Sequence, residues 1–378
     1  MAAYETDPST LQSAHSLHNL PRQLLAGVAI TASCLAANAP AVHADTLPAK
    51  SPAPTITGEP RFLGAAVSTR FLDQPGYIET FRDNFDSLTP ENELKMVSTE
   101  PRPNLFTFDK ADKLVDLALT EGKRVHGHAL IYPAQDPYWV QRYAATCRDG
   151  INDKAESAEL LNAMNRHITT VMEHFKDRIH EWDVVNEPSD VNNAWDKCVG
   201  PKYINEAFAV AHQVDPSAKL YISEFDVETA TKYGQPNQRY QKFQSIVQQL
   251  IANHAPINGV GLQAHVTPSF SGHMKELGDT IDSFSQQGLT VELTEADVAL
   301  PLGLSDPLDS KRQIATYAGM AKICGRRKAC LGMTTWSVND TTSWLAPGNP
   351  ALIDANNTPK PSLQLVRKYL AAPNTSKK

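Results

Sequence analysis

The stretch Trp182-Asp183-Val184-Val185-Asn186-Glu187-Pro188 predicts a β-strand that runs straight into a carboxylate. Its valines favour an extended chain, and the proline closes the strand directly after Glu187. A second stretch, Val291-Glu292-Leu293-Thr294-Glu295-Ala296-Asp297, has the same character. By the two-residue period of a strand, Glu295 continues a row of apolar residues and stands where a core residue is expected.

Short β-like segments alternate with helical ones on both sides of these two stretches, from Arg61 onward. Apolar residues over 161–175 recur at three- and four-residue steps, as on one face of a helix, and Gly288 predicts the end of a helix over Thr280–Gln287. Eight strands that alternate with helices predict an α/β fold, a (β/α)8 TIM barrel in a single catalytic domain over 61–372. The predicted strands are Phe62–Val67, Phe85–Leu88, Arg124–Ile131, Ile179–Asn186, Lys219–Ser223, Gly259–Ala264, Thr290–Glu295 and Leu331–Trp336.

The functional side chains of such a barrel gather at the carboxyl ends of its strands. Polar or aromatic residues occupy that position on six of the predicted strands: Glu91, Asn92 and Lys95 on the second, His128 and Gln135 on the third, Asn186 and Glu187 on the fourth, Gln263 and His265 on the sixth, Glu295 on the seventh and Trp336 on the eighth. Two glutamates held in this way are typical of a retaining glycosidase, in which one carboxyl attacks the anomeric carbon and the other protonates the leaving oxygen. A single glutamate at a strand end is more often just exposed or salt-bridged, so the pair carries the prediction.

The chain from about residue 58 to 370 resembles glycoside hydrolase family 10, whose members are mostly endo-β-1,4-xylanases with a barrel of this type. The resemblance rests on the segments 88–95, 127–130, 182–187, 261–265, 293–297 and 336–344. It implies that Glu187 is the acid/base and Glu295 the nucleophile of an O-glycoside hydrolase. It also implies that the sugar is bound by Glu91, Asn92, Lys95, His128, Tyr132, Gln135, Gln263, Trp336 and Trp344.

Neighbouring residues supply further expectations for the site. We expect the charge of Glu295 to raise the pKa of Glu187 by repulsion, and His265 to hold the nucleophile through a hydrogen bond. Asn186 is predicted to bond the 2-hydroxyl of the sugar. The alternatives are a core histidine satisfied by a backbone carbonyl and a strand-ending amide without a ligand. Without the family resemblance, both tryptophans would be interpreted as core residues.

Several positions depart from the family pattern. Tyr132-Pro133 stand where Trp-His is usual, Met96 replaces a Trp, Leu345 replaces an Arg, and Phe225-Asp226 stand where Tyr-Asn is common. The leading hypothesis is an endo-β-1,4-xylanase that hydrolyses xylan or xylo-oligosaccharides by double displacement. One alternative keeps the chemistry but acts on a plant glycoside with a non-sugar or bulky aglycone. A second is an inactive carbohydrate-binding barrel, against which Asn186, Glu187, His265 and Glu295 together speak.

The first 60 residues differ in character from the rest. Arg22 precedes an apolar stretch from Leu24 to Ala37, and Val42-His43-Ala44 follows as a small-residue cleavage site. This pattern predicts an export signal over 1–44 and a secreted protein, extracellular or periplasmic. The stretch is too short to span a bilayer, so we expect no membrane anchor. Prolines, Thr and Ser over 45–60 predict a flexible linker.

Cleavage of that signal leaves four cysteines, an even number that suggests two disulfides in an exported chain. Cys324 and Cys330 are close in sequence, so a local pair is expected there, and Cys147 is left to pair with Cys198. The Cys324/Cys330 spacing also resembles a disulfide of some family members. The alternative is four buried thiols.

Composition and motifs exclude other classes of function. The chain is 41% hydrophobic and 20% charged with a formal net charge of -7, which gives no support to nucleic-acid binding. His126 and His128 share a strand face and could share an ion, but no HExxH run or tight Cys/His cluster supplies further ligands, so no metal is predicted. No phosphate-loop motif occurs, and no cofactor is expected. We expect a monomer whose partner is a β-linked xylo-oligosaccharide or plant glycoside.

Overall fold

The computed structural model describes residues 61–371, except 149, 153, 191–192 and 302–306. The predicted export signal and linker therefore lie outside the described residues. The described residues all belong to one compact unit. No helix among the described residues is long and apolar enough to cross a membrane.

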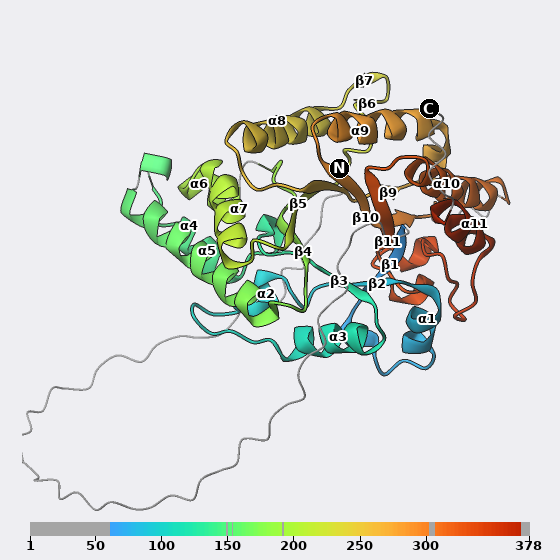
Figure 1. Ribbon diagram of the computed structural model, residues 1–378, viewed down its shortest axis with the longest axis horizontal. Helices are drawn as coiled ribbons and strands as arrows, with labels where there is room; N and C mark the ends of the chain where they lie inside the picture. The colour runs from blue at the N-terminus through green and yellow to red at the C-terminus, as the bar shows by residue number, and fades with distance from the viewer. Residues whose placement is uncertain (1–60, 149, 153, 191–192, 302–306, 372–378) are drawn as a thin grey trace, which may run out of the picture. The chain divides into compact units, whose positions relative to one another are not determined.

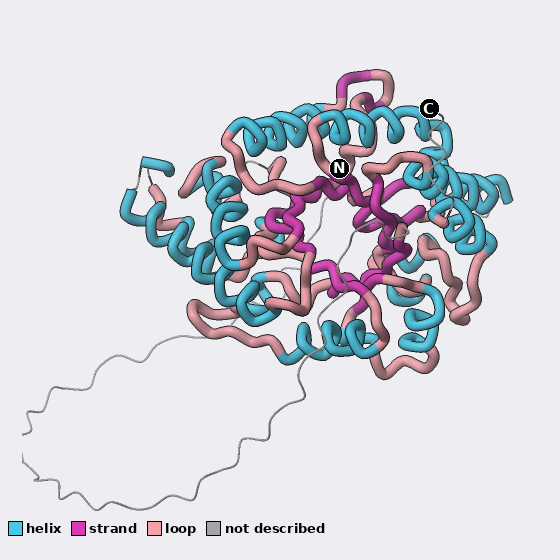
Figure 2. Tube along the Cα trace, viewed as in Figure 1, coloured by secondary structure: helices cyan, strands magenta, loops and turns pink. Residues whose placement is uncertain are grey.

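Eight parallel strands close into a barrel, as predicted (Figure 2). Their order is β11-β1-β2-β3-β4-β5-β8-β10, and pairing of β10 with β11 closes the ring. The bounds are β1 Phe62–Val67, β2 Ser87–Pro90, β3 Arg124–Gly127, β4 Glu181–Asn186, β5 Lys219–Glu224, β8 Gly259–Leu262, β10 Thr290–Val298 and β11 Cys330–Thr335. The short β9 (His265–Val266) pairs with the end of β10, and β6 (Thr231–Lys232) forms a small hairpin with β7 (Gln235–Pro236).

Helices surround the strands (Figure 1). The longer ones are α1 Tyr77–Asn84, α3 Asp109–Thr120, α5 Lys154–Phe175, α7 Lys202–Val214, α8 Gln238–Ala252, α9 Met274–Gln286, α10 Pro307–Gly325 and α11 Pro361–Leu370. Three shorter ones are α2 Met96–Thr99, α4 Tyr138–Ala144 and α6 Ala194–Cys198. The apolar face predicted for α5 is buried from Met164 to Phe175, with Leu161 only half-buried. The helix predicted to end before Gly288 does so, but begins six residues earlier than predicted, at Met274, and Gly288 takes a left-handed φ of 84°.

Only the first strand has both of its predicted bounds, and the other seven differ by one to four residues at one or both ends. Two of these differences, in the third and sixth strands, concern how the chain leaves the sheet. The third strand ends at Gly127 rather than Ile131, although Leu130 and Ile131 still donate to the carbonyls of Asp183 and Val184 at 3.0 Å each. The sixth ends at Leu262, because Ala264 adopts a left-handed φ of 60° that leaves the ladder. Both departures occur at carboxyl ends, where the chain turns its side chains toward the mouth of the barrel.

The barrel interior near the amino-terminal ends of the strands is charged rather than apolar. Arg124 donates to Glu181 and lies 3.8 Å from a carboxylate oxygen of Glu292. Nδ1 of His126 lies 3.8 Å from Glu181 and 3.4 Å from Glu292, while its Nε2 lies 3.2 Å from Asp183. Branched apolar side chains usually fill this space in such barrels. Here opposite charges pair within it, which offsets the cost of burying each charge singly.

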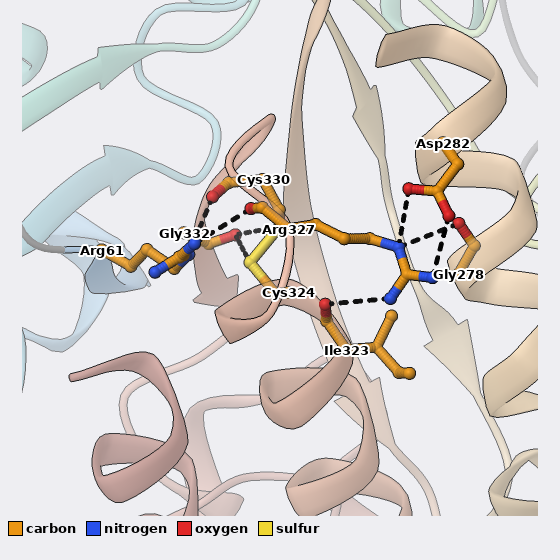
Figure 3. The surroundings of a disulfide bond; sticks show 8 residues. All are labelled: Arg61, Gly278, Asp282, Ile323, Cys324, Arg327, Cys330 and Gly332. Carbon is orange, nitrogen blue, oxygen red and sulfur yellow. Dashed lines mark hydrogen bonds and ion pairs between the residues drawn. A yellow bond between two sulfur atoms is a disulfide. The ribbon is translucent and has the colours of Figure 1, made fainter. Parts of the chain in front are cut away.

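Both expected disulfides are present in the structure, Cys147–Cys198 and Cys324–Cys330. The second lies beside the start of β11, where its surroundings connect distant parts of the chain (Figure 3). Arg61 donates to the carbonyls of Arg327 and Cys330, and the Arg327 guanidinium pairs with Asp282 on α9 at 2.9 Å. This loop therefore ties the first strand, the last strand and α9 together.

Candidate active site

The carboxyl ends of the strands surround a cavity of about 370 Å³. Every side chain predicted for catalysis or sugar binding lines it, and Phe225 is the one lining residue that was not in the predicted set. The lining residues are Glu91, Asn92, Lys95, His128, Tyr132, Gln135, Asn186, Glu187, Phe225, Gln263, His265, Glu295, Trp336 and Trp344. The rule that functional groups gather at strand ends thus locates the cavity, while the role of each residue stays a prediction.

Glu187 follows β4 with a left-handed φ of 53°, which turns its side chain away from the strand direction. Its Oε1 accepts hydrogen bonds from the hydroxyl of Tyr132 and from Nε2 of Gln263, each at 3.0 Å. Burial raises the pKa of Glu187, the Gln263 hydrogen bond opposes this, and the charge of Glu295 raises it further. The predicted rise in the pKa and the predicted repulsion by Glu295 are both present, but burial is the larger cause.

Glu295 lies within β10 and is buried. Its Oε2 lies 3.3 Å from Nε2 of His265, and its Oε1 lies 3.9 Å from Nε2 of His128. Among the described residues, Oε1 has no hydrogen-bond partner. One oxygen is thus held in place while the other keeps its lone pairs, which suits a group that must attack carbon.

His265 is held from its other side by a carboxylate that the sequence argument missed. Its Nδ1 lies 2.9 Å from Oδ2 of Asp297, which also accepts a hydrogen bond from the indole of Trp344 at 3.0 Å. Burial alone would lower the pKa of His265, but the charge of Asp297 and the hydrogen bonds to Asp297 and Glu295 raise it to about 10. A positive imidazolium therefore faces Glu295 at neutral pH. Asp297 follows Glu295 by two residues, so the strand period could have placed both on one face.

A second buried carboxylate, Asp183, supports His128. Its Oδ2 lies 2.8 Å from Nδ1 of His128 and 3.2 Å from Nε2 of His126. Burial acts to raise the pKa of Asp183, but the charge of His126 and the contacts with both histidines hold it below its ordinary value. For His126, burial alone would lower the pKa. The charge of Asp183 and the contacts of His126 with Asp183, Glu181 and Glu292 instead raise it well above the usual value.

His126 and His128, considered above as two ligands of one ion, both contact Asp183. The ligand atoms of His126, Glu181 and Glu292 do lie within 4.8 Å of one another, a spacing that could suit a cation. Arg124 already pairs with both of these carboxylates, so a cationic side chain balances their charge.

The residues predicted to bind the sugar, here called the sugar-binding box, gather around the cation of Lys95 and include several aromatic rings. Nζ of Lys95 donates to Asn92 at 3.0 Å and lies 5.3 Å and 5.9 Å from the ring centroids of Tyr132 and Trp336. Burial lowers the pKa of Lys95, and nearby carboxylates, Glu295 first among them, oppose that effect. Such a set offers polar groups for hydroxyls and apolar faces for pyranose rings.

Two amides connect the acid to this set. Nε2 of Gln263 donates both to Glu187 and, at 3.2 Å, to Oδ1 of Asn186. The Asn186 carbonyl is therefore engaged, which leaves its amide nitrogen for a sugar hydroxyl. Trp344 is 57% exposed and Trp336 only 7%, so the two tryptophans predicted as ring platforms differ in how much surface they offer.

Comparisons with known proteins show which family and fold the chain is similar to. The model of glycosyl hydrolase family 10 matches residues 55–369. The beta-1,4-xylanase of Dictyoglomus thermophilum is 32% identical over 330 residues, which cover 81% of this chain and 88% of the relative. Endo-1,4-beta-xylanase A of Caldicellulosiruptor sp. (strain Rt8B.4) is 31% identical over 79% of this chain, which spans only 44% of that longer protein. Among solved structures, xylanase 10B from Thermotoga petrophila RKU-1 in complex with xylobiose superposes with a TM-score of 0.74 at 29% identity, covering 82% of this chain and 94% of that one.

Proposed function

Because the chain belongs to glycosyl hydrolase family 10 and is an O-glycoside hydrolase, we propose that it is an endo-β-1,4-xylanase that acts with net retention at the anomeric carbon. The observation that carries the proposal is the contrast between two carboxylates in one cavity. Burial raises the pKa of Glu187, whereas Glu295 faces the cationic His265. Environments that separate an acid from a base in this way are those that retaining hydrolysis needs.

The first step forms a covalent intermediate. Oε1 of Glu295 attacks the anomeric carbon, and the carboxyl of Glu187 gives its proton to the glycosidic oxygen as the bond to the leaving group breaks. Tyr132 and Gln263 donate hydrogen bonds to Oε1 of Glu187, so they stabilise its negative charge once the proton has left. Asn186 and the polar groups of the sugar-binding box hold the sugar in place.

The second step reverses these roles. Glu187, now ionised, takes a proton from a water molecule, and the water oxygen attacks the anomeric carbon from the side that the leaving group has vacated. The bond to Glu295 breaks, and the sugar leaves with its original anomeric configuration. His265 bridges Asp297 and Glu295 and so keeps the departing carboxylate in the position it had at the start.

The stereochemistry of the first-formed product tests the proposal. Proton NMR during xylan or xylotetraose hydrolysis should show the β-anomer first, and initial appearance of the α-anomer would refute retention. Azide should restore turnover of an activated aryl β-xylobioside by Glu187→Ala, because that variant keeps its nucleophile. Glu295→Ala should stay inactive under the same conditions. A wild-type protein without turnover would support the binding-protein alternative instead.

A second candidate keeps this chemistry and changes the leaving group to a plant aglycone. It is favoured by Phe225, an apolar ring without a hydroxyl in the cavity wall, and by Leu345, which follows the exposed Trp344. Relative kcat/KM on xylotetraose and on aryl or terpenoid β-xylosides distinguishes the two candidates.

We also propose that the protein is exported. Its two disulfides support this, since such bonds persist in oxidising compartments. N-terminal sequencing of the mature protein should find a start near Asp45, and recovery of an intact residue 1 from the cytoplasm would refute export.

A further inference from the structure

We propose that Arg239, on α8, is a positioning residue that sets the preference for the leaving group by holding the Phe225 ring in the cavity wall. Arg239 is not among the residues that line the cavity, and so it acts through its neighbours. The inference rests on the hydrolase function proposed above and concerns the part of the cavity that the sugar-binding box does not cover.

The order of strands shows which side of the cavity Phe225 belongs to. The acid follows β4 and the nucleophile lies on β10, so the ring of strands is divided into two arcs. The arc through β3, β2, β1 and β11 carries eight of the nine residues predicted to bind the sugar, and the ninth, Gln263, follows β8 and donates to Glu187. Phe225 follows β5, on the opposite arc. A substrate that crosses the two carboxylates with its glycone in the first arc must place its leaving group toward the second.

Arg239 stacks on the Phe225 ring and is itself held by two carboxylates. Its Cζ lies 3.9 Å from the centroid of the Phe225 ring, within stacking distance. Its Nη1 donates to Oε1 of Glu224 and its Nη2 donates to Oδ1 of Asp190, each at 2.9 Å. A planar guanidinium fixed at both ends keeps a defined orientation, so the ring stacked on it is confined as well.

The same contacts reach the backbone near the acid. Oε2 of Glu224 accepts a hydrogen bond from the amide of Ser189 at 3.0 Å, and Oε1 accepts one from the amide of Phe225 at 3.1 Å. Ser189 comes two residues after Glu187, and its carbonyl accepts from Nζ of Lys242 at 2.6 Å. Glu224 thus joins the segment after the acid to the segment that presents the ring, and Arg239 is the cation that balances it.

Glu224 depends on that cation because it is fully buried. Burial raises the pKa of Glu224 to about 7, and the charge of Arg239 and the hydrogen bonds from Ser189 oppose the rise. Without Arg239 the pKa of Glu224 would rise further, so the buried carboxyl would be protonated over more of the pH range and would accept the two backbone hydrogen bonds less strongly. The ring would then lose its stacking partner and the anchor of its own amide together.

Two substrates with one glycone separate this effect from general damage. Xylobiosyl fluoride carries a leaving group with no ring, and xylotetraose places two sugars on the leaving-group side. Losing an ordered ring contact should lower kcat/KM of Arg239→Ala for xylotetraose about 3- to 10-fold, mainly through KM. Turnover of the fluoride should change less than about 2-fold. Arg239→Lys keeps a charge for Glu224 but lacks the planar fork, so it should fall between wild type and Arg239→Ala.

A double-mutant cycle tests whether Arg239 acts through the ring. In a Phe225→Ala background, the xylotetraose defect of Arg239→Ala should largely disappear, because residues in contact are not additive. Arg312→Ala, which removes an exposed arginine paired with Asp309 on α10, is the matched control and should leave both substrates unaffected. Circular dichroism and thermal melting check that each variant is folded.

Three outcomes would overturn the inference: an equal loss on both substrates, no loss on xylotetraose, or a full additive penalty in the Phe225→Ala background. Should Arg239→Ala fail to fold, Asp190→Asn weakens the same guanidinium from its exposed end, and it must then reduce xylotetraose turnover selectively. Absence of turnover by the wild-type protein on either substrate would instead refute the hydrolase function on which the inference rests.

Discussion

Replacing Tyr132 by Phe should move the alkaline limb of the pH profile of kcat/KM upward. The Tyr132 hydroxyl donates to Oε1 of Glu187 at 3.0 Å. It can bond the ionised carboxylate in this way but gains less from the protonated one, so it lowers the pKa of the acid. Glu187 must be protonated in the first step, and activity falls as pH rises through its pKa. Removing the donor raises that pKa and extends activity to higher pH.

The size of the effect follows from the two donors on one oxygen. A hydrogen bond to a charged group contributes about 1.5 to 3 kcal/mol, and 1.36 kcal/mol corresponds to about one pH unit. Gln263 remains as the second donor, and water can reach the partly exposed Glu187, so only part of that energy is lost. We expect the limb to move by about 0.5 to 1 pH unit. The phenyl ring of the variant keeps the contact with Lys95, which isolates the hydroxyl.

The assay compares two aryl β-xylobiosides that share a glycone. A poor leaving group needs protonation and should show the displaced limb, whereas a dinitrophenyl leaving group departs without the acid and should not. Tyr138→Phe is the matched control, since Tyr138 is 72% exposed and does not line the cavity. An unmoved limb with the poor leaving group, or one displaced to lower pH, would refute the role given to the hydroxyl.

Three further predictions concern stability and substrate preference. Replacing Cys147 and Cys198 together by Ser should lower the free energy of unfolding by about 4 kcal/mol, because the bridge spans 51 residues, against about 2 kcal/mol for the Cys324–Cys330 pair; equal losses in urea unfolding would contradict the loop-entropy argument. His126→Gln should destabilise the fold by about 3 kcal/mol near pH 5 to 6 and by less at alkaline pH. Folding raises the pKa of His126, so its protonated ring stabilises the fold fully below the unfolded pKa of about 6.5, and this stabilisation is lost as pH rises through the pKa of the folded state. A loss that grows with pH would show that His126 is neutral. Restoring Trp-His at Tyr132-Pro133 should raise xylohexaose turnover by roughly 5- to 30-fold relative to an aryl xylobioside, as one or two contacts of about 1 kcal/mol each would do, and unchanged ratios would show that these departures are neutral.

The barrel and its cavity were predictable because both depend on local patterns. Alternating strand and helix periods predict the architecture, and the strand-end rule then gathers residues that lie far apart in the chain. The left-handed backbone at Glu187 and Ala264 was not predictable in this way, since neither residue type favours that conformation. It is these turns that direct the side chains into the cavity.

The buried acids were harder to recognise from sequence. Asp183, Glu224 and Asp297 lie on strands or at their ends and resemble ordinary polar positions until their partners are known. Asp183 contacts His126 and His128, Glu224 pairs with Arg239, and Asp297 pairs with His265. Each pairing joins different strands or a strand and a helix, so it depends on tertiary structure that no single segment encodes. For the same reason, burial could not be recognised from sequence as the main cause of the raised pKa of Glu187.

The pairing of β1 with β11 makes the sheet close only through its last strand. Arg61 reaches the carbonyl of Cys330 across a separation of 269 residues, so β1 keeps one open edge until nearly the whole chain has been synthesised. At synthesis rates of about 5 to 20 residues per second, that interval lasts roughly 15 to 55 s, and an unpaired edge is a site for aggregation throughout it. The Cys324–Cys330 bridge needs only a six-residue separation. In an oxidising compartment it can therefore form before the distant first strand has paired, and it orders the start of the segment that completes the ring.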